Sequence, residues 1–272
     1  MKIRLIAILA AFALTGAFAG GGSDNSTTAL AAPYTIEVGG STSVTPLMEA
    51  LQAGYAAVRP NVRVNISGTG SGDGITNAGV TYQIGMSSRE LTAAEQGRGL
   101  HAVTVAIDGI AVIINRDNPV SNLTVEQIRG IYTGAITNWS QVGGRNAAIA
   151  VVSREAGSGT RGAFEEIIGF QGRLLAGANE STSTGAIKAG IVQNPNAIGY
   201  ISLGSVDNTI KSISVGGAAA TTANVRSGRY AVARPFIILT GRNVHGESKA
   251  FVDWMLSSAG QAIVNRSWIP VN

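Results

Sequence analysis

Short runs rich in β-branched residues alternate with segments of helical periodicity from Tyr34 onward, and this alternation limits the possible folds more than any other feature. The strand-like runs are TIEVGG, VRVNISG and QIGMSS, and the helical segments are residues 46–58, a stretch after Gly74, and TAAEQG. Strands that alternate with helices predict an α/β fold with largely parallel sheets. With 272 residues, the chain can bury a sizeable core as one large domain or as two lobes.

Two apolar runs, residues 109–115 (GIAVIIN) and 234–240 (RPFIILT), are predicted to be buried strands because they are β-branched and nearly uninterrupted. If both runs pass between two lobes, residues 34–113 plus 235–272 form lobe I, and residues 114–234 form lobe II. A single continuous sheet is the alternative, and the sequence leaves it open.

The start of the chain has the pattern of a secretory signal peptide. In residues 1–19, Lys2 and Arg4 precede an uncharged run of ten residues, and the segment ends in an A-x-A cleavage pattern. A helix needs roughly 20 apolar residues to cross a bilayer, so the short run disfavours the alternative of a permanent anchor. Residues 20–33, rich in Gly, Ser and Thr, predict a flexible linker. We therefore expect an exported protein that is periplasmic, at the cell surface or extracellular.

Composition and charge exclude further classes of protein. The chain has no cysteine, so neither disulfides nor Cys-based metal sites are available. The net charge of +4 includes Lys2 and Arg4, which leaves +2 for a product that begins at Gly20. The Lys and Arg residues are scattered, whereas nucleic-acid-binding proteins concentrate them in a patch or run. We expect no nucleic-acid partner.

Three polar loops share one design: residues 39–45 (GGSTSVT), 67–74 (SGTGSGDG) and 154–161 (REAGSGTR). Each follows a strand-like run and leads into a helical segment. The first N–H groups of a helix have no internal partners and carry partial positive charge, and Ser and Thr add hydroxyl donors. The loops therefore predict an anion-binding site. The alternative is that Ser and Thr serve as helix N-caps and the glycines as turns.

The third loop adds a permanent cation, because the Arg154 guanidinium can grip a tetrahedral oxyanion through two donors. Arg161 and Arg89 are further candidates. For each of these two, a surface or interlobe salt bridge is the expected role.

Signs of catalysis are weak. Residues 157–162 match G-x-G-x-x-G after a strand-like run, but Glu180, at the spacing of a dinucleotide-binding acid, does not follow an apolar run. The chain lacks a G-K-[ST] phosphate loop, a G-x-S-x-G elbow and H-E-x-x-H. The only histidines, His101 and His245, have no partners at metal-ligand spacing and are expected to be structural or exposed. We expect no catalytic residue, cofactor or metal ion.

Several segments together resemble a known family. GGSTSVTPL, SGTGSGDGI, IGMSSRE, IDGIAVIIN, IYTGAITNW and VVSREAGSGTR occur in the order seen in PstS-type periplasmic phosphate-binding proteins, and AIGYISLG and ARPFIIL also fit. The resemblance extends from Tyr34 nearly to the end of the chain. It implies a type II periplasmic-binding-protein fold, in which two crossover strands join two α/β lobes and the ligand lies in the cleft. It further implies a receptor that delivers inorganic phosphate to the membrane permease subunits of an ABC importer. The sequence leaves the oligomeric state open, with a monomer as the default expectation for a diffusing receptor.

The resemblance also assigns roles to individual positions. The phosphate ligands that it implies are Thr42 and Ser43 from the first loop, Ser71 from the second, Ser88 after IGMS, and Arg154, Ser158, Gly159 and Thr160 from the other lobe.

Ser88 departs from the family pattern, because some relatives carry an aspartate at this position. A buried carboxylate can accept the proton that phosphate retains at neutral pH and repels fully ionised sulfate. Asp108 is the candidate replacement, with a helix or turn cap as its alternative role. Asp73 is expected at a helix start, where the helix dipole favours it.

Three other functions stay open at the level of the sequence. The chain could be a receptor for sulfate, molybdate or tungstate, which offer no proton to a carboxylate acceptor. It could be a secreted enzyme that acts on phosphorylated substrates. It could also be an adhesion or signalling module that keeps the fold without the ligand.

Overall fold

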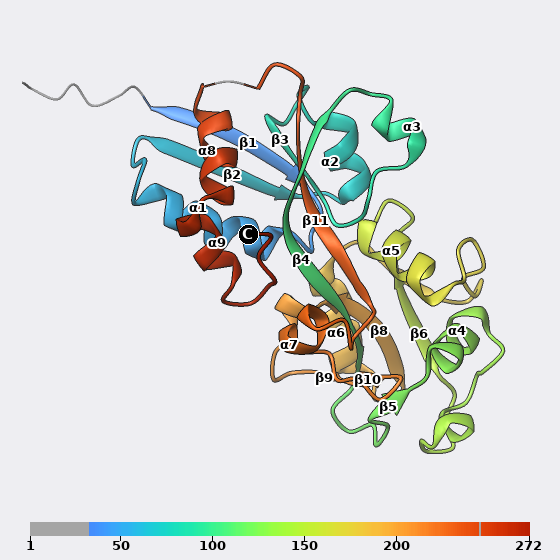
Figure 1. The fold of residues 1–272 in the computed structure, drawn as a ribbon. Helices are drawn as coiled ribbons and strands as arrows, with labels where there is room; N and C mark the ends of the chain where they lie inside the picture. The colour runs from blue at the N-terminus through green and yellow to red at the C-terminus, as the bar shows by residue number, and fades with distance from the viewer. Residues whose placement is uncertain (1–32, 245) are drawn as a thin grey trace, which may run out of the picture. The chain divides into compact units, whose positions relative to one another are not determined.

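The helices and strands follow the alternation that the sequence predicts. The computed structural model describes residues 33–244 and 246–272 (Figure 1). The strands are β1 (Tyr34–Gly40), β2 (Val62–Gly68), β3 (Ile84–Ser87), β4 (His101–Ile114), β5 (Asn122–Leu123), β6 (Ala150–Arg154), β7 (Asn179–Ser181), β8 (Ala197–Ser202), β9 (Lys211–Ser212), β10 (Ser214–Val215) and β11 (Ala233–Thr240). The helices are α1 (Thr45–Ala56), α2 (Ser71–Asn77), α3 (Ala93–Gln96), α4 (Val125–Thr133), α5 (Gly159–Ile168), α6 (Thr184–Gln193), α7 (Thr222–Arg226), α8 (Gly246–Leu256) and α9 (Ser258–Val264), with short 3-10 turns η1 (Trp139–Val142) and η2 (Leu203–Ser205). The predicted signal peptide, residues 20–32 of the predicted linker and His245 lie outside the described residues.

The main sheet is mixed rather than largely parallel, which corrects the prediction. Its hydrogen-bonded order is β2-β1-β3-β11-β4-β8-β6-β7, with β9 beside β4. β1 runs parallel to β2 and β3, and β6 runs parallel to β7 and β8. β11 is antiparallel to β3 and β4, and β4 is antiparallel to β8. The reversal arises because the chain leaves the first parallel group along β4 and returns to it along β11.

β4 and β11 lie side by side and connect two hydrophobic cores (Figure 1). β4 contributes Val105 and Ala106 to one core and residues 110–114 to the other. β11 contributes Phe236 to the first core, and Val232, directly before the strand, belongs to the second. Both apolar runs are therefore buried strands, as predicted. Since β4 pairs with β11 and with β8, the hydrogen-bonded sheet is also continuous, so the single-sheet alternative describes the pairing correctly.

The second core contains an aromatic group beside α5 and β8. The rings of Phe164 and Tyr200 stack with their centroids 4.1 Å apart, and Tyr132 packs at 5.1 Å from Phe164 and 5.5 Å from Phe170. Stacked and edge-on aromatic pairs of this kind stabilise a core beyond the area that they bury. They fix α4, α5 and β8 against one another, and α5 carries part of the third polar loop.

The second polar loop enters its helix earlier than the sequence predicts. The helix expected after Gly74 begins at Ser71, directly after Gly70, whose φ is 101°. Asp73 lies in the first turn of this helix, as predicted, where its carboxylate accepts hydrogen bonds from Thr69, Asn77 and Tyr82. These local bonds stabilise the helix start ahead of the position that the pattern alone suggests.

Candidate functional site

The polar ends of three strands meet at one edge of the sheet. Because β1, β2 and β3 are parallel neighbours, their carboxyl ends lie together. The Ser41 hydroxyl donates to Ser88 Oγ at 2.9 Å, and Ser71 Oγ lies 3.3 Å from Ser88 Oγ. The Ser88 amide donates to Ser71 Oγ at 3.1 Å. All three side chains are buried, so the first two polar loops and the residue after β3 form one polar group inside the protein.

Hydroxyl groups from α5 and α6 face this polar group. Thr160 Oγ1 lies 2.8 Å from Ser43 Oγ and 3.4 Å from Ser88 Oγ. Thr184 Oγ1 lies 3.3 Å from both Ser43 Oγ and Thr42 Oγ1. The resulting hydroxyl cluster consists of Thr42, Ser43, Ser71, Ser88, Thr160 and Thr184. Sequence reasoning missed Thr184, although the residues around it (STSTG) have the composition of the other polar loops.

Gly159, in the first turn of α5, packs directly against Ser71 and Ser88 of the cluster. An added Cβ at this position would lie 2.3 Å from Ser71 Oγ, 2.9 Å from Ser71 Cβ and 2.8 Å from Ser88 Oγ. These distances are well inside van der Waals contact, so any side chain here would push α5 away from Ser71 and Ser88. The absence of a Cβ therefore allows the first turn of α5 to reach the cluster.

Helix capping accounts for the hydroxyl of Ser158 but not for the hydroxyls of the first two polar loops. Ser158 is the N-cap of α5, and its hydroxyl accepts from the Arg161 amide at 3.3 Å. α1 and α2 follow Val44 and Gly70, and neither N-cap residue makes a side-chain capping bond. The hydroxyls of the first two loops are thus available for other partners.

Arg154 is the buried first residue of the third loop, and its neighbour in sequence, Glu155, balances its charge. Its Nε and Nη2 atoms each donate to a Glu155 carboxylate oxygen at 2.9 Å. The same two nitrogens donate to the carbonyl oxygens of Ser181 and Thr182 at 3.2 and 3.3 Å. The Arg154 amide donates to the Tyr200 hydroxyl at 3.2 Å, which fixes the backbone at this position. These bonds orient the guanidinium, because a planar group held through two of its nitrogens keeps a single direction.

A second buried arginine, Arg234 in β11, contacts the cluster and was not predicted. Its Nη1 donates to Thr160 Oγ1 at 2.9 Å and to the Ser88 carbonyl at 3.4 Å. Its Nη2 donates to the Asp108 carboxylate at 3.0 Å, across the register pair that joins β11 to β4. A charged residue at the start of an apolar strand was the signal in the sequence, since such a charge is rarely buried without a partner.

Asp108 accepts hydrogen bonds from Arg234 and, at 3.5 Å, from the Gly204 amide. Arg234 thus stands between this carboxylate and Thr160. Burial raises the pKa of Asp108 to about 6, against the opposing effects of Arg234 and of the Ser202 hydroxyl. Burial also lowers the pKa of Arg234 to about 10, against the opposing effect of Asp108. The pKa of Asp108 rises and that of Arg234 falls because the removal of each charge from water costs more free energy than the attraction between the two charges returns.

The remaining sequence candidates take the structural roles expected of them. Arg89 pairs with Glu95 at 2.7 Å and lowers the pKa of Glu95 to about 2. Arg161 pairs with Glu165 at 2.7 Å and with Glu180 at 3.2 Å. Glu180 lies in the short polar strand β7 and does not follow an apolar strand, and its carboxylate is engaged by Arg161.

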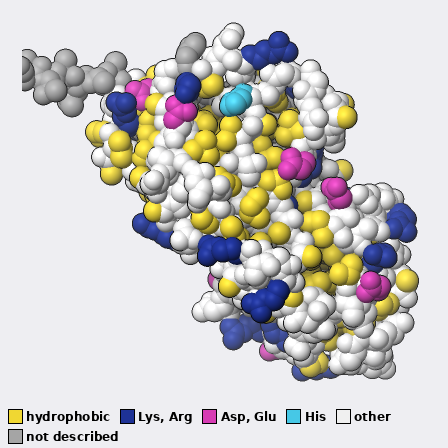
Figure 2. All heavy atoms as spheres, in the orientation of Figure 1, with side chains coloured by type: hydrophobic (Ala, Val, Ile, Leu, Met, Phe, Trp, Pro, Cys, Tyr) yellow, Lys and Arg dark blue, Asp and Glu magenta, His cyan; other side chains and the backbone are white. Residues whose placement is uncertain are grey.

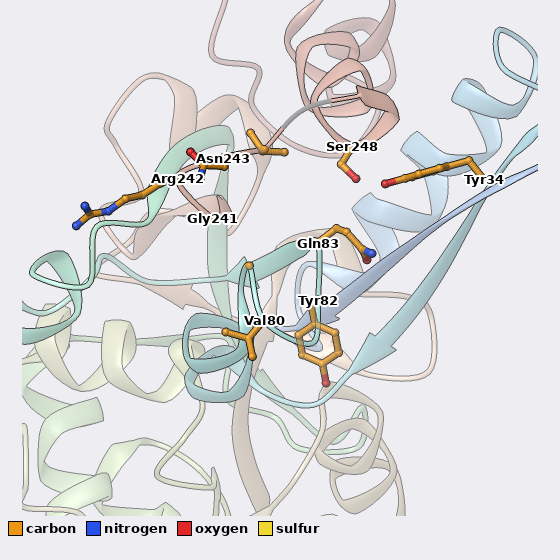
Figure 3. A pocket seen from close by; sticks show the side chains of 10 residues that line it. Tyr34, Val80, Tyr82, Gln83, Gly241, Arg242, Asn243 and Ser248 are labelled. Carbon is orange, nitrogen blue, oxygen red and sulfur yellow. The ribbon is translucent and has the colours of Figure 1, made fainter.

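A pocket of about 400 Å³ lies apart from the cluster and contains none of its residues (Figure 3). It is lined by Tyr34, Val80, Tyr82, Gln83 and Ser248, among others. Arg242 extends away from Tyr34 and Ser248, and its guanidinium lies where a Cβ of Gly99 would be (Figure 3). No charged group is aimed into this pocket from the residues that line it, so it is a poorer anion site than the hydroxyl cluster.

Other features of the described residues bear on the predicted class. Lys and Arg side chains are dispersed over the face shown in Figure 2, without a continuous basic patch. His101 is exposed. Within residues 33–244 and 246–272, no group of three His, Cys, Asp or Glu side chains could hold a metal ion. Over the same part of the chain, no helix is long and apolar enough to span a membrane.

The protein consists of two α/β parts that are joined by paired crossover strands, with hydroxyls and buried charges between them. This arrangement defines the class of solute-binding proteins with the type II periplasmic-binding fold. Residues 24–259 match the model of the PBP superfamily domain. The phosphate-binding protein PstS of Borreliella burgdorferi is 30% identical over 244 residues, which cover 84% of this chain and 87% of the relative. The chain therefore belongs to the PstS-type phosphate-binding proteins of the PBP superfamily.

Solved structures agree with this assignment. A Clostridium perfringens protein, assigned as a phosphate ABC transporter substrate-binding protein and solved with bound phosphate, is 44% identical, with a TM-score of 0.86 over 88% of this chain and 100% of that chain. An ABC-type phosphate transport receptor of Vibrio cholerae is 39% identical, with a TM-score of 0.72 over 87% of this chain and 99% of that chain. The family consists of transport receptors rather than enzymes.

Proposed function

We propose that this protein binds inorganic phosphate at the hydroxyl cluster and delivers it to an ABC-type phosphate importer. The observation that carries the proposal is the meeting of Ser43, Ser88 and Thr160 hydroxyls within 2.8–3.4 Å, beside the buried guanidinium group of Arg234. A tetrahedral oxyanion that takes the place of these mutual contacts gives each hydroxyl an acceptor of higher charge. Exclusion of water makes each of these bonds stronger than it is in bulk solvent.

The proposed ligands come from both sides of the crossover strands. Thr42, Ser43, Ser71 and Ser88 donate from one lobe, and Arg154, Ser158, Gly159 and Thr160 donate from the other. The Nε and Nη2 atoms of Arg154 are committed to Glu155 and to carbonyl oxygens, so we assign Nη1 to phosphate. The backbone amides at the start of α5 add the partial positive charge of a helix N-terminus.

The proposed lobes keep the bounds derived from the sequence, residues 34–113 plus 235–272 and residues 114–234. The hydrophobic residues divide into two cores, which supports a hinge in the crossover strands. In β4 the change from one core to the other lies between Ala106 and Ile110, a short distance before the lobe bound at residue 113. Binding then consists of closure of the lobes on the ion, a motion expected on microseconds to milliseconds, without a chemical step.

The transport role rests on the names of the relatives, which are phosphate-binding and phosphate-transport proteins. We propose that the protein is exported as a monomer, periplasmic or at the cell surface, and that its loaded form docks on the permease subunits of the importer. Receptors for sulfate, molybdate or tungstate, and enzymes acting on phosphorylated substrates, are outcomes that the following test separates.

Calorimetric titration of the mature, ligand-stripped protein tests the proposal, with phosphate, sulfate and molybdate in parallel. We expect one phosphate per chain and weaker binding of the other anions. Arg154→Ala should weaken phosphate binding by about 10- to 150-fold, the worth of one charged hydrogen bond, while the melting curve stays cooperative. Preferential binding of sulfate or molybdate would change the assigned ligand. Turnover of a chromogenic phosphate ester would instead indicate an enzyme, and unchanged phosphate affinity in Arg154→Ala would refute the site.

A further inference from the structure

Arg234 is a buried cation that lies between Asp108 and the hydroxyl cluster. Its side chain is 1% exposed, and its Nε, among the described residues, has no hydrogen-bond partner. The guanidinium lies 5.1 Å from the centre of the Phe236 ring. An isolated buried pair with Asp108 is weak support for stability, because desolvation offsets the attraction between the two charges. The position of Arg234 between Asp108 and Thr160 therefore calls for another explanation.

The contact with Thr160 determines how the hydroxyl cluster is polarised. An arginine N–H can only donate, so Thr160 Oγ1 accepts from Nη1 and keeps its own hydrogen for another partner. The neighbours of that hydroxyl are Ser43 Oγ and Ser88 Oγ, on the opposite side of the cluster. Arg234 thus directs the Thr160 hydrogen into the space where an anion would accept it.

The charge of Arg234, close to that of Arg154, also affects which charge state of an anion the site favours. The charge of Arg154 adds to the effect of burial in lowering the pKa of Arg234, which means that the two guanidinium groups repel one another. Glu155 and Asp108 each balance one arginine from outside the cluster. A doubly charged ion between the two arginines relieves their repulsion more than a singly charged ion does.

We infer that Arg234 is a specificity-determining residue of this site, which supplies a second buried positive charge and holds the Thr160 hydroxyl as a donor, so that the site favours doubly charged phosphate over the singly charged form. The inference rests on the proposed function and deepens it. It assigns a role to the crossover strand β11, from which no ligand was predicted. It also makes Asp108 a positioning residue for Arg234, in place of the direct acceptor role predicted from the sequence.

The pH dependence of phosphate affinity is the readout, because phosphate passes from the singly to the doubly charged form through neutrality. The titratable and charged groups that face Arg234 are Asp108 on β4, Arg154 on β6 and Tyr200 on β8. Burial raises the pKa of Tyr200 to about 12, so Tyr200 stays neutral, and Asp108 titrates near pH 6. Between pH 6.5 and 8.5, phosphate passes from mostly singly to mostly doubly charged, whereas Asp108 is already about three-quarters ionised at pH 6.5, so most of the charge change is that of phosphate.

The experiment is a calorimetric titration with inorganic phosphate at pH 6.5, 7.5 and 8.5. In the wild-type protein, affinity should rise with pH by up to about tenfold per unit where the singly charged form predominates. Arg234→Gln should bind about 10- to 150-fold more weakly at pH 8.5 and show a flatter profile, because its site has lost one charge. Arg234→Lys should restore the slope. Arg229→Gln, which removes an exposed charge, is the matched control and should behave as wild type.

A lone charge left at Asp108 could prevent Arg234→Gln from folding, so Asp108→Asn/Arg234→Gln is tested beside it. The double variant leaves no unpaired buried charge at this pair and should still bind more weakly than wild type at pH 8.5 with a flatter profile, because the cation that donates to Thr160 is absent in both variants. Wild-type affinity in either variant, or a loss by the same factor at every pH, would overturn the inference, since a structural role alone lowers affinity uniformly. The wild-type titration distinguishes failure of this inference from failure of the proposed function, because absence of phosphate binding by the wild type refutes the proposed function itself.

Discussion

Replacing Gly159 by alanine is expected to weaken phosphate binding while leaving each core intact. The new Cβ would lie 2.9 Å from Ser71 Cβ and 2.3 Å from Ser71 Oγ. Carbon atoms in good contact are about 3.5–4.0 Å apart, so the first turn of α5 must retreat by on the order of 1 Å. Rotation of Ser71 could move its hydroxyl but not its Cβ, and it would remove a donor from the cluster.

The expected magnitude follows from this overlap. Forcing one extra methyl group into a packed site costs about 1–3 kcal/mol, which corresponds to about 5- to 150-fold in the dissociation constant. The cost falls on the form in which α5 touches Ser71 and Ser88, which is the proposed phosphate-bound form. Helix propensity acts in the opposite direction, because alanine favours the first turn of α5 over glycine.

Calorimetry with phosphate, together with thermal melting with and without phosphate, measures both effects. Gly157→Ala is a matched control in the same loop, because nothing lies within 4 Å of a Cβ at that position. We expect Gly157→Ala to bind as wild type and Gly159→Ala to lose most of the stabilisation that phosphate confers. Equal phosphate affinities in the two variants would refute the reasoning that α5 closes on Ser71 and Ser88 at Gly159.

Two further predictions concern stability. The raised pKa of Asp108, about 6 against an ordinary 3.8, means that its contribution to the free energy of unfolding is present below pH 4 and is lost as the pH rises through 6. At about 1.4 kcal/mol per pKa unit, the loss in the free energy of unfolding is at most about 3 kcal/mol. Urea unfolding from pH 4 to 7 should show this loss for the wild type but not for Asp108→Asn/Arg234→Gln. The same pH dependence of the free energy of unfolding in both proteins would contradict the prediction. Tyr200→Phe should lower the free energy of unfolding by about 1–2 kcal/mol, because its hydroxyl accepts from the Arg154 amide and contacts Ser153 Oγ at 2.8 Å. Tyr132→Phe is the matched control in the same aromatic group and should be neutral or stabilising, because the Tyr132 hydroxyl is buried with no partner among the described residues; a loss as large as that of Tyr200→Phe would count against this account.

Local pattern was sufficient for most of the fold and for much of the site. Apolar runs predicted β4 and β11, and glycine- and serine-rich segments after strands predicted the loops before α1, α2 and α5. The parallel sheet was wrong in part, because strand direction depends on the route of the chain between two cores and not on the composition of any strand. The start of α2 was misplaced because the hydrogen bonds of Asp73 come from residues on both sides of it, which periodicity does not record.

The sequence by itself determined which residue types are available at the site: hydroxyls and glycines at helix starts, with Arg154 beside them. Only the tertiary structure decided which of them meet. Arg234 and Asp108 are 126 positions apart, and their pairing depends on the register between β11 and β4. The contacts of Thr184 with Thr42 and Ser43 likewise join segments more than 140 positions apart. Such contacts depend on how whole elements pack, and a local pattern carries no information about the register or distance between elements that are remote in the chain.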